Sequence, residues 1–182
     1  MAKIRLLFAT GIAAWFAIKL YGLGTWTWEQ SNQAGILWNL ACVTSVAALM
    51  GYIHRNEDVF LVRWKNVAKT TVLYSFLLSC SMGLWYYGLV PETIEQRKTE
   101  QLELLEAFVN DSEALADIQS TNATLERQSA DEIYAQQAAN LEVFFSPIFF
   151  IGTVLMVWIF TAAALAAVFA TVMPKIWNAR PE

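Results

Sequence analysis

The stretch WYYGLVPETIEQRKTEQLELLEAF (Trp85–Phe108) changes from an apolar, aromatic run to a carboxylate-rich run within a few residues. The change falls at Pro91, which suits the first turn of a new helix because the N–H that proline lacks would have no partner there. Glu92 and Glu95 follow, and carboxylates are favourable near the positive end of a helix dipole. The stretch therefore predicts a junction between an apolar helix and a separate acidic helix.

The composition places the apolar part of this junction in a membrane. The chain has 182 residues, of which 57% are hydrophobic and 15% are charged, whereas soluble domains carry about 25% charged residues. The apolar residues are concentrated in four runs, at 4–23, 34–53, 70–90 and 147–173. A run of about 20 residues at 1.5 Å per residue crosses a hydrocarbon core of about 30 Å. The runs do not alternate, and lipid-facing backbone must satisfy its own hydrogen bonds, so we expect helices.

These observations predict an all-α integral membrane four-helix bundle with an extramembrane helical hairpin between the third and fourth spans. Residues 1–90 would hold the first three spans. Residues 91–146 would form the acidic hairpin, and residues 147–182 the fourth span with a short tail.

The basic residues predict the orientation, because lysine and arginine are enriched in cytoplasmic segments. If both termini are cytoplasmic, eight basic residues lie inside and three outside; the inner set is Lys3, Arg5, Arg55, Arg63, Lys65, Lys69, Lys175 and Arg180, and the outer set is Arg97, Lys98 and Arg127. We therefore expect both termini in the cytoplasm and the hairpin outside. The piece VFLVRW (Val59–Trp64) of the basic inner loop could lie along the headgroups as a short interfacial segment.

The acidic segment has its own helix signals. Residues 91–143 carry twelve acidic and three basic side chains, a net charge of −9. Apolar residues recur at helical spacing from Ile94 to Val109, a stop signal follows at residues 110–112, and Ser129–Glu132 is typical of a capping box that opens another helix. Pro147 then kinks or restarts the chain as the fourth span.

Two interpretations of this hairpin remain open. Its apolar stripes either meet only each other, so that the hairpin caps the bundle, or part of the stripe or the acidic face docks a partner protein. A helix lying on the membrane surface is disfavoured, because such helices are typically basic and anionic lipid would repel this segment. The candidate partner-binding residues are Leu102, Leu105, Phe108, Val109, Ile133 and Tyr134.

Polar residues inside the predicted spans form the other candidate site. Lys19 is the one charged side chain well inside a span, and an intramembrane ionisable residue is a functional hypothesis by default. Its stem is long enough to reach the interface, so it is either a structural anchor or a substrate or proton site. Thr44, Ser75 and Ser79 complete the candidate set, although such hydroxyls often bond to carbonyls of neighbouring turns.

Catalytic, metal-binding and nucleotide-binding motifs are missing from the sequence, so we expect no enzymatic activity, no cofactor and no metal, and the acidic balance argues against nucleic acid. Small residues recur every four positions in the spans, for example Ala162, Ala166 and Ala170, a pattern typical of close helix packing in lipid. The leading hypothesis is therefore an assembly, accessory or scaffold subunit that contacts the lipid bilayer and forms a homo-oligomer or binds a membrane-protein partner. The alternative is a small channel or carrier that uses Lys19 and the intramembrane hydroxyls.

The segments WYYGLVPETIEQ (Trp85–Gln96) and FFSPIFFIGTVLMVWIFTAAALAAV (Phe144–Val168), followed by Lys175, resemble an uncharacterised bacterial family of small four-span membrane proteins. Members of that family have a third span that ends in aromatic residues before a proline, then an acidic helix, a long outer insert and a Ser-Pro entry to the last span. The resemblance implies a bacterial inner (plasma) membrane location with cytoplasmic termini. It implies no catalytic residues.

Overall fold

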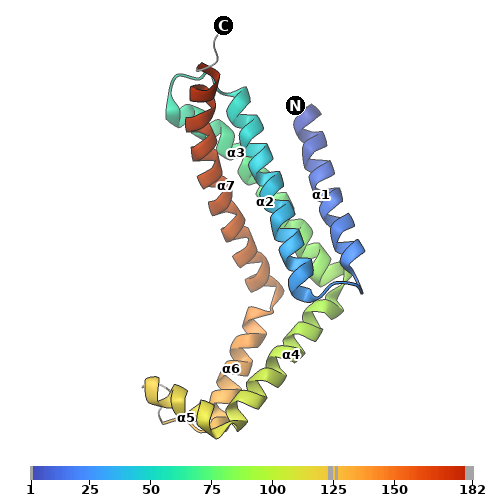
Figure 1. Ribbon diagram of the computed structural model, residues 1–182, viewed down its shortest axis with the longest axis vertical. Helices are drawn as coiled ribbons and strands as arrows, with labels where there is room; N and C mark the ends of the chain where they lie inside the picture. The colour runs from blue at the N-terminus through green and yellow to red at the C-terminus, as the bar shows by residue number, and fades with distance from the viewer. Residues whose placement is uncertain (1, 123–124, 126, 179–182) are drawn as a thin grey trace. The chain divides into compact units, whose positions relative to one another are not determined.

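The computed structural model describes residues 2–122, 125 and 127–178, and in this part of the chain the fold is all-α (Figure 1). Its helices are α1 (Ala2–Gly22), α2 (Trp28–Ile53), α3 (Phe60–Leu84), the π-helix η1 (Trp85–Leu89), α4 (Pro91–Asn110), α5 (Ser112–Thr121), α6 (Ala130–Phe144) and α7 (Pro147–Asn178). The chain forms two compact units. Unit 1 comprises Met1–Ser81 and Val154–Glu182, and unit 2 comprises Met82–Thr153.

Four helices of the described residues are long and apolar enough to cross a membrane: Ile4–Gly22, Trp28–Ile53, Phe60–Leu89 and Pro147–Trp177. The chain is thus suited to be an integral membrane protein, and the predicted fold class is confirmed. Arg180, one of the basic residues used to predict orientation, lies outside the described residues.

Two of these helices begin earlier than the apolar runs. α2 begins at Trp28 because Thr27 and Gln30 form a capping box, in which each side chain accepts a hydrogen bond from the other residue's backbone N–H. α3 begins at Phe60, so most of the segment Val59–Trp64 is the first part of the third apolar helix rather than a separate interfacial piece. Local capping and helix continuity extend these elements beyond the lipid-length run.

Unit 1 is held together by close approaches at small residues. The indole Nε1 of Trp38 on α2 donates to the Gly11 carbonyl of α1 over 2.9 Å, and α1 and α2 lie side by side in Figure 1. A Cβ placed on Gly51 of α2 would lie 2.9 Å from the Phe169 carbonyl oxygen of α7. On α7 the buried stripe includes Ala162, Ala166 and Ala170, each with 0% of its surface exposed. These residues allow backbones to pack without intervening side chains.

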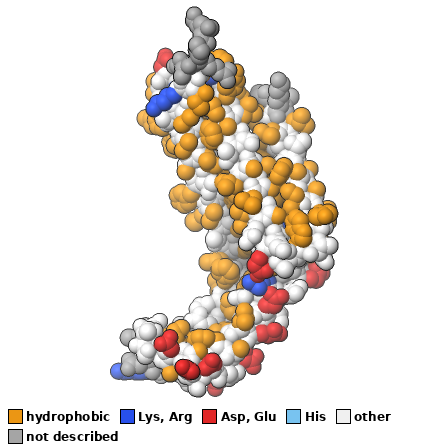
Figure 2. Space-filling view, in the orientation of Figure 1, with side chains coloured by type: hydrophobic (Ala, Val, Ile, Leu, Met, Phe, Trp, Pro, Cys, Tyr) orange, Lys and Arg blue, Asp and Glu red, His pale blue; other side chains and the backbone are white. Residues whose placement is uncertain are grey.

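An irregular turn of helix lies near the start of unit 2. η1 closes with a hydrogen bond of 2.9 Å from the Val90 N–H to the Trp85 carbonyl, five residues back, and Pro91 then occupies the first turn of α4. The Tyr87 hydroxyl donates to the Phe145 carbonyl over 2.9 Å, which ties η1 to the C-terminal cap of α6. α4 and α6 pack together as the two arms of a hairpin. Figure 2 shows acidic side chains gathered over α4–α6 and hydrophobic ones over the other helices.

Candidate functional site

The predicted site residue Lys19 is buried, with 3% of its surface exposed. Its ammonium donates to the Ser31 carbonyl over 2.9 Å, to the Ser31 hydroxyl over 3.1 Å and to Asn32 Oδ1 over 3.2 Å, all at the N-terminal end of α2. Gly35 makes room for this arrangement, because a Cβ there would lie 3.1 Å from Lys19 Cε and 3.1 Å from Trp15 Nε1. Lys19 thus joins α1 to the first turns of α2, a geometry that suits a structural anchor.

The predicted intramembrane hydroxyls divide into two groups. Ser75 and Ser79 lie one turn apart on α3 and are fully buried, whereas Thr44 on α2 is only half-buried. The Ser79 hydroxyl donates to the Ser75 carbonyl over 2.9 Å, and Thr71, one turn earlier, donates in the same way to Val67. Ser75 Oγ is buried and has no hydrogen-bond partner among the described residues. The hydroxyls of Ser79 and Thr71 therefore bond within α3, whereas the buried Ser75 hydroxyl is left to interact with another group.

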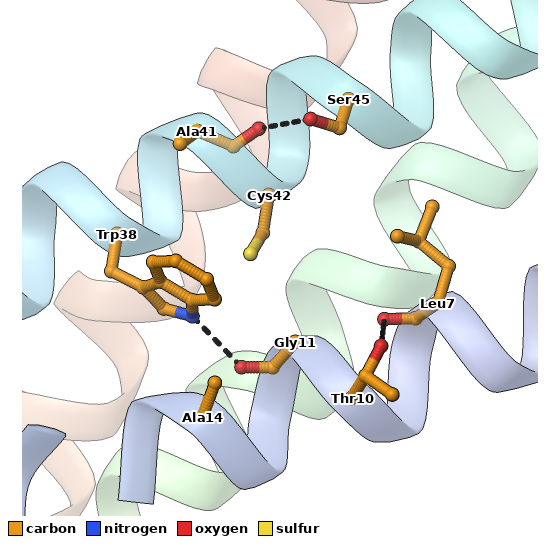
Figure 3. Close-up of a pocket in the computed structure, with 8 residues that line it drawn as sticks. All are labelled: Leu7, Thr10, Gly11, Ala14, Trp38, Ala41, Cys42 and Ser45. Atoms are coloured by element: carbon orange, nitrogen blue, oxygen red, sulfur yellow. Dashed lines mark hydrogen bonds between the residues drawn. The ribbon is translucent and has the colours of Figure 1, made fainter. Parts of the chain in front are cut away.

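A pocket of about 340 Å³ lies between α1 and α2 (Figure 3). The Cys42 sulfur points into it from α2, and Trp38 closes one side through its bond to Gly11. The hydroxyls at its edge, Thr10 and Ser45, donate to carbonyls of their own helices, 2.9 Å to Leu6 and 2.8 Å to Ala41. The pocket is therefore an apolar space whose polar groups are already engaged.

The turn between α2 and α3 holds a hydrogen-bonded cluster that the sequence analysis did not identify. The Glu57 carboxylate lies 2.6 Å from His54 Nδ1 and accepts two bonds from the Asn66 amide, at 2.8 and 3.0 Å. Arg63 donates to the Glu57 carbonyl and, through Nε, to the Ala170 carbonyl of α7 over 2.5 Å. Trp64 also donates to α7, at the Ala163 carbonyl. The cluster fastens the turn to the last part of α7.

The electrostatics of this cluster keep Glu57 ionised. Burial by itself raises the pKa of Glu57, but the hydrogen bonds from His54 and Asn66 and the charges of His54 and Arg63 outweigh it, so the net pKa is below the usual value. In the sequence, the only signal of this cluster is that His54, Glu57, Arg63 and Asn66 occur within thirteen residues of one another. That signal does not reveal that the acceptor of Arg63 lies on α7.

The predicted partner-binding residues lie in the hairpin, and most of them pack against one another. Val109 and Ile133 are 7% and 2% exposed, and with Leu125 they form a buried cluster in the hairpin. Leu105, Phe108 and Tyr134 are partly buried against this core, and Leu102 is also half-buried. Leu104, which the same stripe contains, is 61% exposed instead. The stripe is thus used mainly within the hairpin, and the surface that remains is rich in carboxylates.

Comparison of the chain with protein-family models, with curated proteins and with solved structures finds no match.

Proposed function

We propose that this protein is a non-enzymatic membrane subunit that assembles with a membrane-protein partner through the acidic hairpin of α4–α6. The supporting observation is that the hairpin uses its apolar residues for its own core and leaves its carboxylates exposed. Glu103, Glu106 and Glu113 are exposed members of this set. A folded, acidic surface of this kind favours a partner whose docking surface is basic, because complementary charge steers association and sets orientation.

The basic residues of the hairpin do little to neutralise this surface. Arg97 pairs with Glu100 over 2.9 Å and Lys98 pairs with Glu142 over 3.6 Å, so both cations are engaged within the hairpin. The remaining carboxylates are in large excess over the remaining cation, Arg127. The attraction of a basic partner should therefore be long-ranged and should weaken as ionic strength rises.

A lateral contact within the membrane is supported by the outer side of α7. Met156, Phe160 and Val168 are 66%, 72% and 52% exposed, whereas Ala162, Ala166 and Ala170 of the same helix are fully buried. Few residues in the most apolar part of this helix are buried among the described residues. This face is available for the apolar helices of a partner or of a second copy.

The experiment places a photocrosslinking residue, benzoylphenylalanine, at two neighbouring positions of α4 in native membranes. At Leu104, which is exposed, we expect adducts with the partner; at Leu105, which packs against the hairpin core, we expect few. The double variant Glu103→Gln/Glu106→Gln should reduce the Leu104 adduct severalfold, because it removes two exposed charges while preserving helix propensity. The proposal would be contradicted if the adduct yield were equal at both positions. It would also be contradicted if the yield at Leu104 did not change in the double variant.

A second candidate, a channel or carrier, rests on the buried polar side chains of unit 1. Asn39, Thr71, Ser75 and Ser79 are each at most 1% exposed, and Ser75 Oγ has no acceptor or donor among the described residues. Proteoliposome swelling and planar-bilayer conductance test this function directly. Swelling or conductance above that of protein-free membranes, and lower in Ser75→Val, would support a channel or carrier. The absence of both would contradict this second candidate function.

A further inference from the structure

Arg55 lies in a corner formed by two aromatic rings at the end of unit 1 where α2 and α7 finish. Its guanidinium carbon is 4.1 Å from the Tyr52 ring centroid and 4.1 Å from the Trp177 ring centroid. The two rings contact each other edge to face, with centroids 5.4 Å apart. We call Tyr52, Arg55 and Trp177 the Arg55 corner. Aromatic faces attract a cation and fix its position, but they leave its positive charge uncompensated.

No carboxylate among the described residues forms an ion pair with Arg55. Its Nη1 donates to the neutral Tyr52 carbonyl over 2.8 Å, and its Nε is buried with no hydrogen-bond partner in the described part of the chain. The nearby carboxylate of Glu57 is engaged by His54 and Asn66. The guanidinium is thus positioned and charged, yet it has no counter-ion from the described chain.

The neighbouring ends of α3 and α7 also carry basic side chains. Lys65 near the start of α3 and Lys175 in the last turn of α7 are both exposed, and neither forms an ion pair with a described residue. The acidic residues of this turn are Glu57 and Asp58 only. Among the described residues, this turn and the adjoining helix ends therefore carry more basic than acidic side chains, and the rings of Tyr52 and Trp177 hold Arg55 in position.

Apolar side chains adjoin the corner on both helices, which indicates what kind of anion fits. Ile53 follows Tyr52 on α2 and is 48% exposed, and Ile176 precedes Trp177 on α7 and is 52% exposed. Tyr and Trp at the ends of membrane helices lie at headgroup depth, where apolar chains end and polar headgroups begin. A ligand with an anionic head and an apolar tail can contact Arg55 with its head and the two isoleucines with its tail. A free anion can contact Arg55 only.

We propose that the Arg55 corner binds the headgroup phosphate of an anionic phospholipid, with Arg55 as the main contact and Lys65 and Lys175 as supporting charges. Clusters of basic side chains at the ends of transmembrane helices bind the headgroups of anionic lipids. Guanidinium is well suited to a phosphate because its N–H donors match two oxygens at once. The site does not depend on the hairpin or on the function proposed for it.

The test measures lipid retained by the full-length protein in detergent after incubation with equal amounts of phosphatidylglycerol and phosphatidylcholine, by native mass spectrometry. We expect the wild type to retain phosphatidylglycerol preferentially. Arg55→Gln should lower the phosphatidylglycerol-to-phosphatidylcholine ratio at least about tenfold, because it removes charge-assisted hydrogen bonds. Lys65→Gln, the matched control, removes the same charge at the same end and should lower the ratio by about fivefold at most.

Further variants keep the proposal testable if Arg55→Gln does not fold. Arg55→Lys keeps the charge but loses the planar fork, and Trp177→Leu keeps Arg55 but removes one wall of the corner; both should lower the ratio more than Lys65→Gln does. A ratio that falls equally in all four variants would show general electrostatic attraction only, and a wild type without preference would show no site. Excess inorganic phosphate should leave the lipid bound; complete displacement would mean that phosphate alone is recognised and would overturn the assignment to a lipid.

Discussion

Arg63 of α3 donates a hydrogen bond from Nε to the backbone carbonyl oxygen of Ala170 in α7, over 2.5 Å. This carbonyl needs an external donor because the residue four positions later is Pro174, which lies inside α7 and has no N–H to offer. Ala170 is fully buried, so an unpaired oxygen there would be costly. The proline and the arginine are therefore complementary: one opens a gap in the hydrogen bonding of α7 and the other fills it.

This relationship predicts an energetic coupling between Arg63 and Pro174. Arg63→Met should lower the free energy of unfolding by about 1.5–3 kcal/mol, the usual contribution of a hydrogen bond from a charged group. In a Pro174→Ala background the alanine N–H can bond to Ala170, so the same Arg63→Met change should cost about 1 kcal/mol less. Thermal unfolding of the four proteins in mild detergent gives the coupling as a double-mutant cycle. Strict additivity of the two changes would show that Pro174 does not create the need for Arg63.

The helices of this protein could be predicted from the sequence wherever a local signal sets them. Pro91 does open α4, Ser129 and Glu132 do form a capping box, and α7 does begin at Pro147. The same kind of signal was present at Thr27, whose capping box with Gln30 starts α2 ahead of the apolar run. Helix ends are local, so residue spacing is sufficient to find them.

The contacts between helices could not be predicted in this way. The partner of Arg63 is a carbonyl more than one hundred residues away, and backbone oxygens carry no signature in the sequence. Lys19 was identifiable as an intramembrane charge, but its partners Ser31 and Asn32 depend on how closely Gly35 lets α1 approach α2. The π-helix η1 likewise has no signal beyond the proline that follows it. Tertiary geometry decides each of these features.

Two glycines should respond in opposite directions to the same substitution. Gly51→Ala would place a Cβ 2.9 Å from the Phe169 carbonyl oxygen, and a backbone atom cannot move aside cheaply. We expect a loss of about 1–3 kcal/mol as α2 and α7 are forced apart. Gly152→Ala meets nothing within 4 Å and should raise stability by up to about 1 kcal/mol, because alanine favours the helix. Unfolding in detergent measures both, and a neutral Gly51→Ala would contradict the close packing described for these helices.

The anchoring role of Lys19 predicts a loss of stability on truncation of its charge. Lys19→Met keeps most of the apolar stem but leaves the Ser31 carbonyl and Asn32 Oδ1 without this donor. We expect the free energy of unfolding to fall by about 1–3 kcal/mol. Leu20→Met is the matched control, since Leu20 is 61% exposed and its change should be nearly neutral. Equal stability of the two variants would argue against a structural anchor and in favour of a transport role for Lys19.

The capping box of α6 predicts a pH dependence of the hairpin. Hydrogen bonds to Glu132 from the Ser129 N–H, at 2.8 Å, and from the Ser129 hydroxyl, at 3.1 Å, lower the pKa of Glu132 from its usual 4.5. Because the pKa is lower in the folded state, this stabilisation is complete above the unfolded value and is lost as the pH falls through the folded value. Glu132→Gln still caps the helix and cannot titrate. The difference in helicity between wild type and Glu132→Gln, followed by circular dichroism, should therefore change only on acidification below about 4.5; a constant difference would mean that the cap is not charge-dependent.

The buried core of the hairpin leads to the last prediction, which tests whether α4–α6 unfold separately from α1 and α2. Ile133 is 2% exposed and packs with Val109 and Leu125, so Ile133→Ala should destabilise α4–α6 by about 2–4 kcal/mol through the cavity it leaves. Leu104→Ala, on the exposed side of α4, should stay within about 0.5 kcal/mol of wild type. Hydrogen exchange should therefore accelerate in residues 91–144 of Ile133→Ala and remain unchanged in α1 and α2, because local unfolding follows compact units. Acceleration that extends equally into α1 and α2 would show that the hairpin and the membrane helices unfold together, and the hairpin could then not act as the self-contained docking element proposed for it.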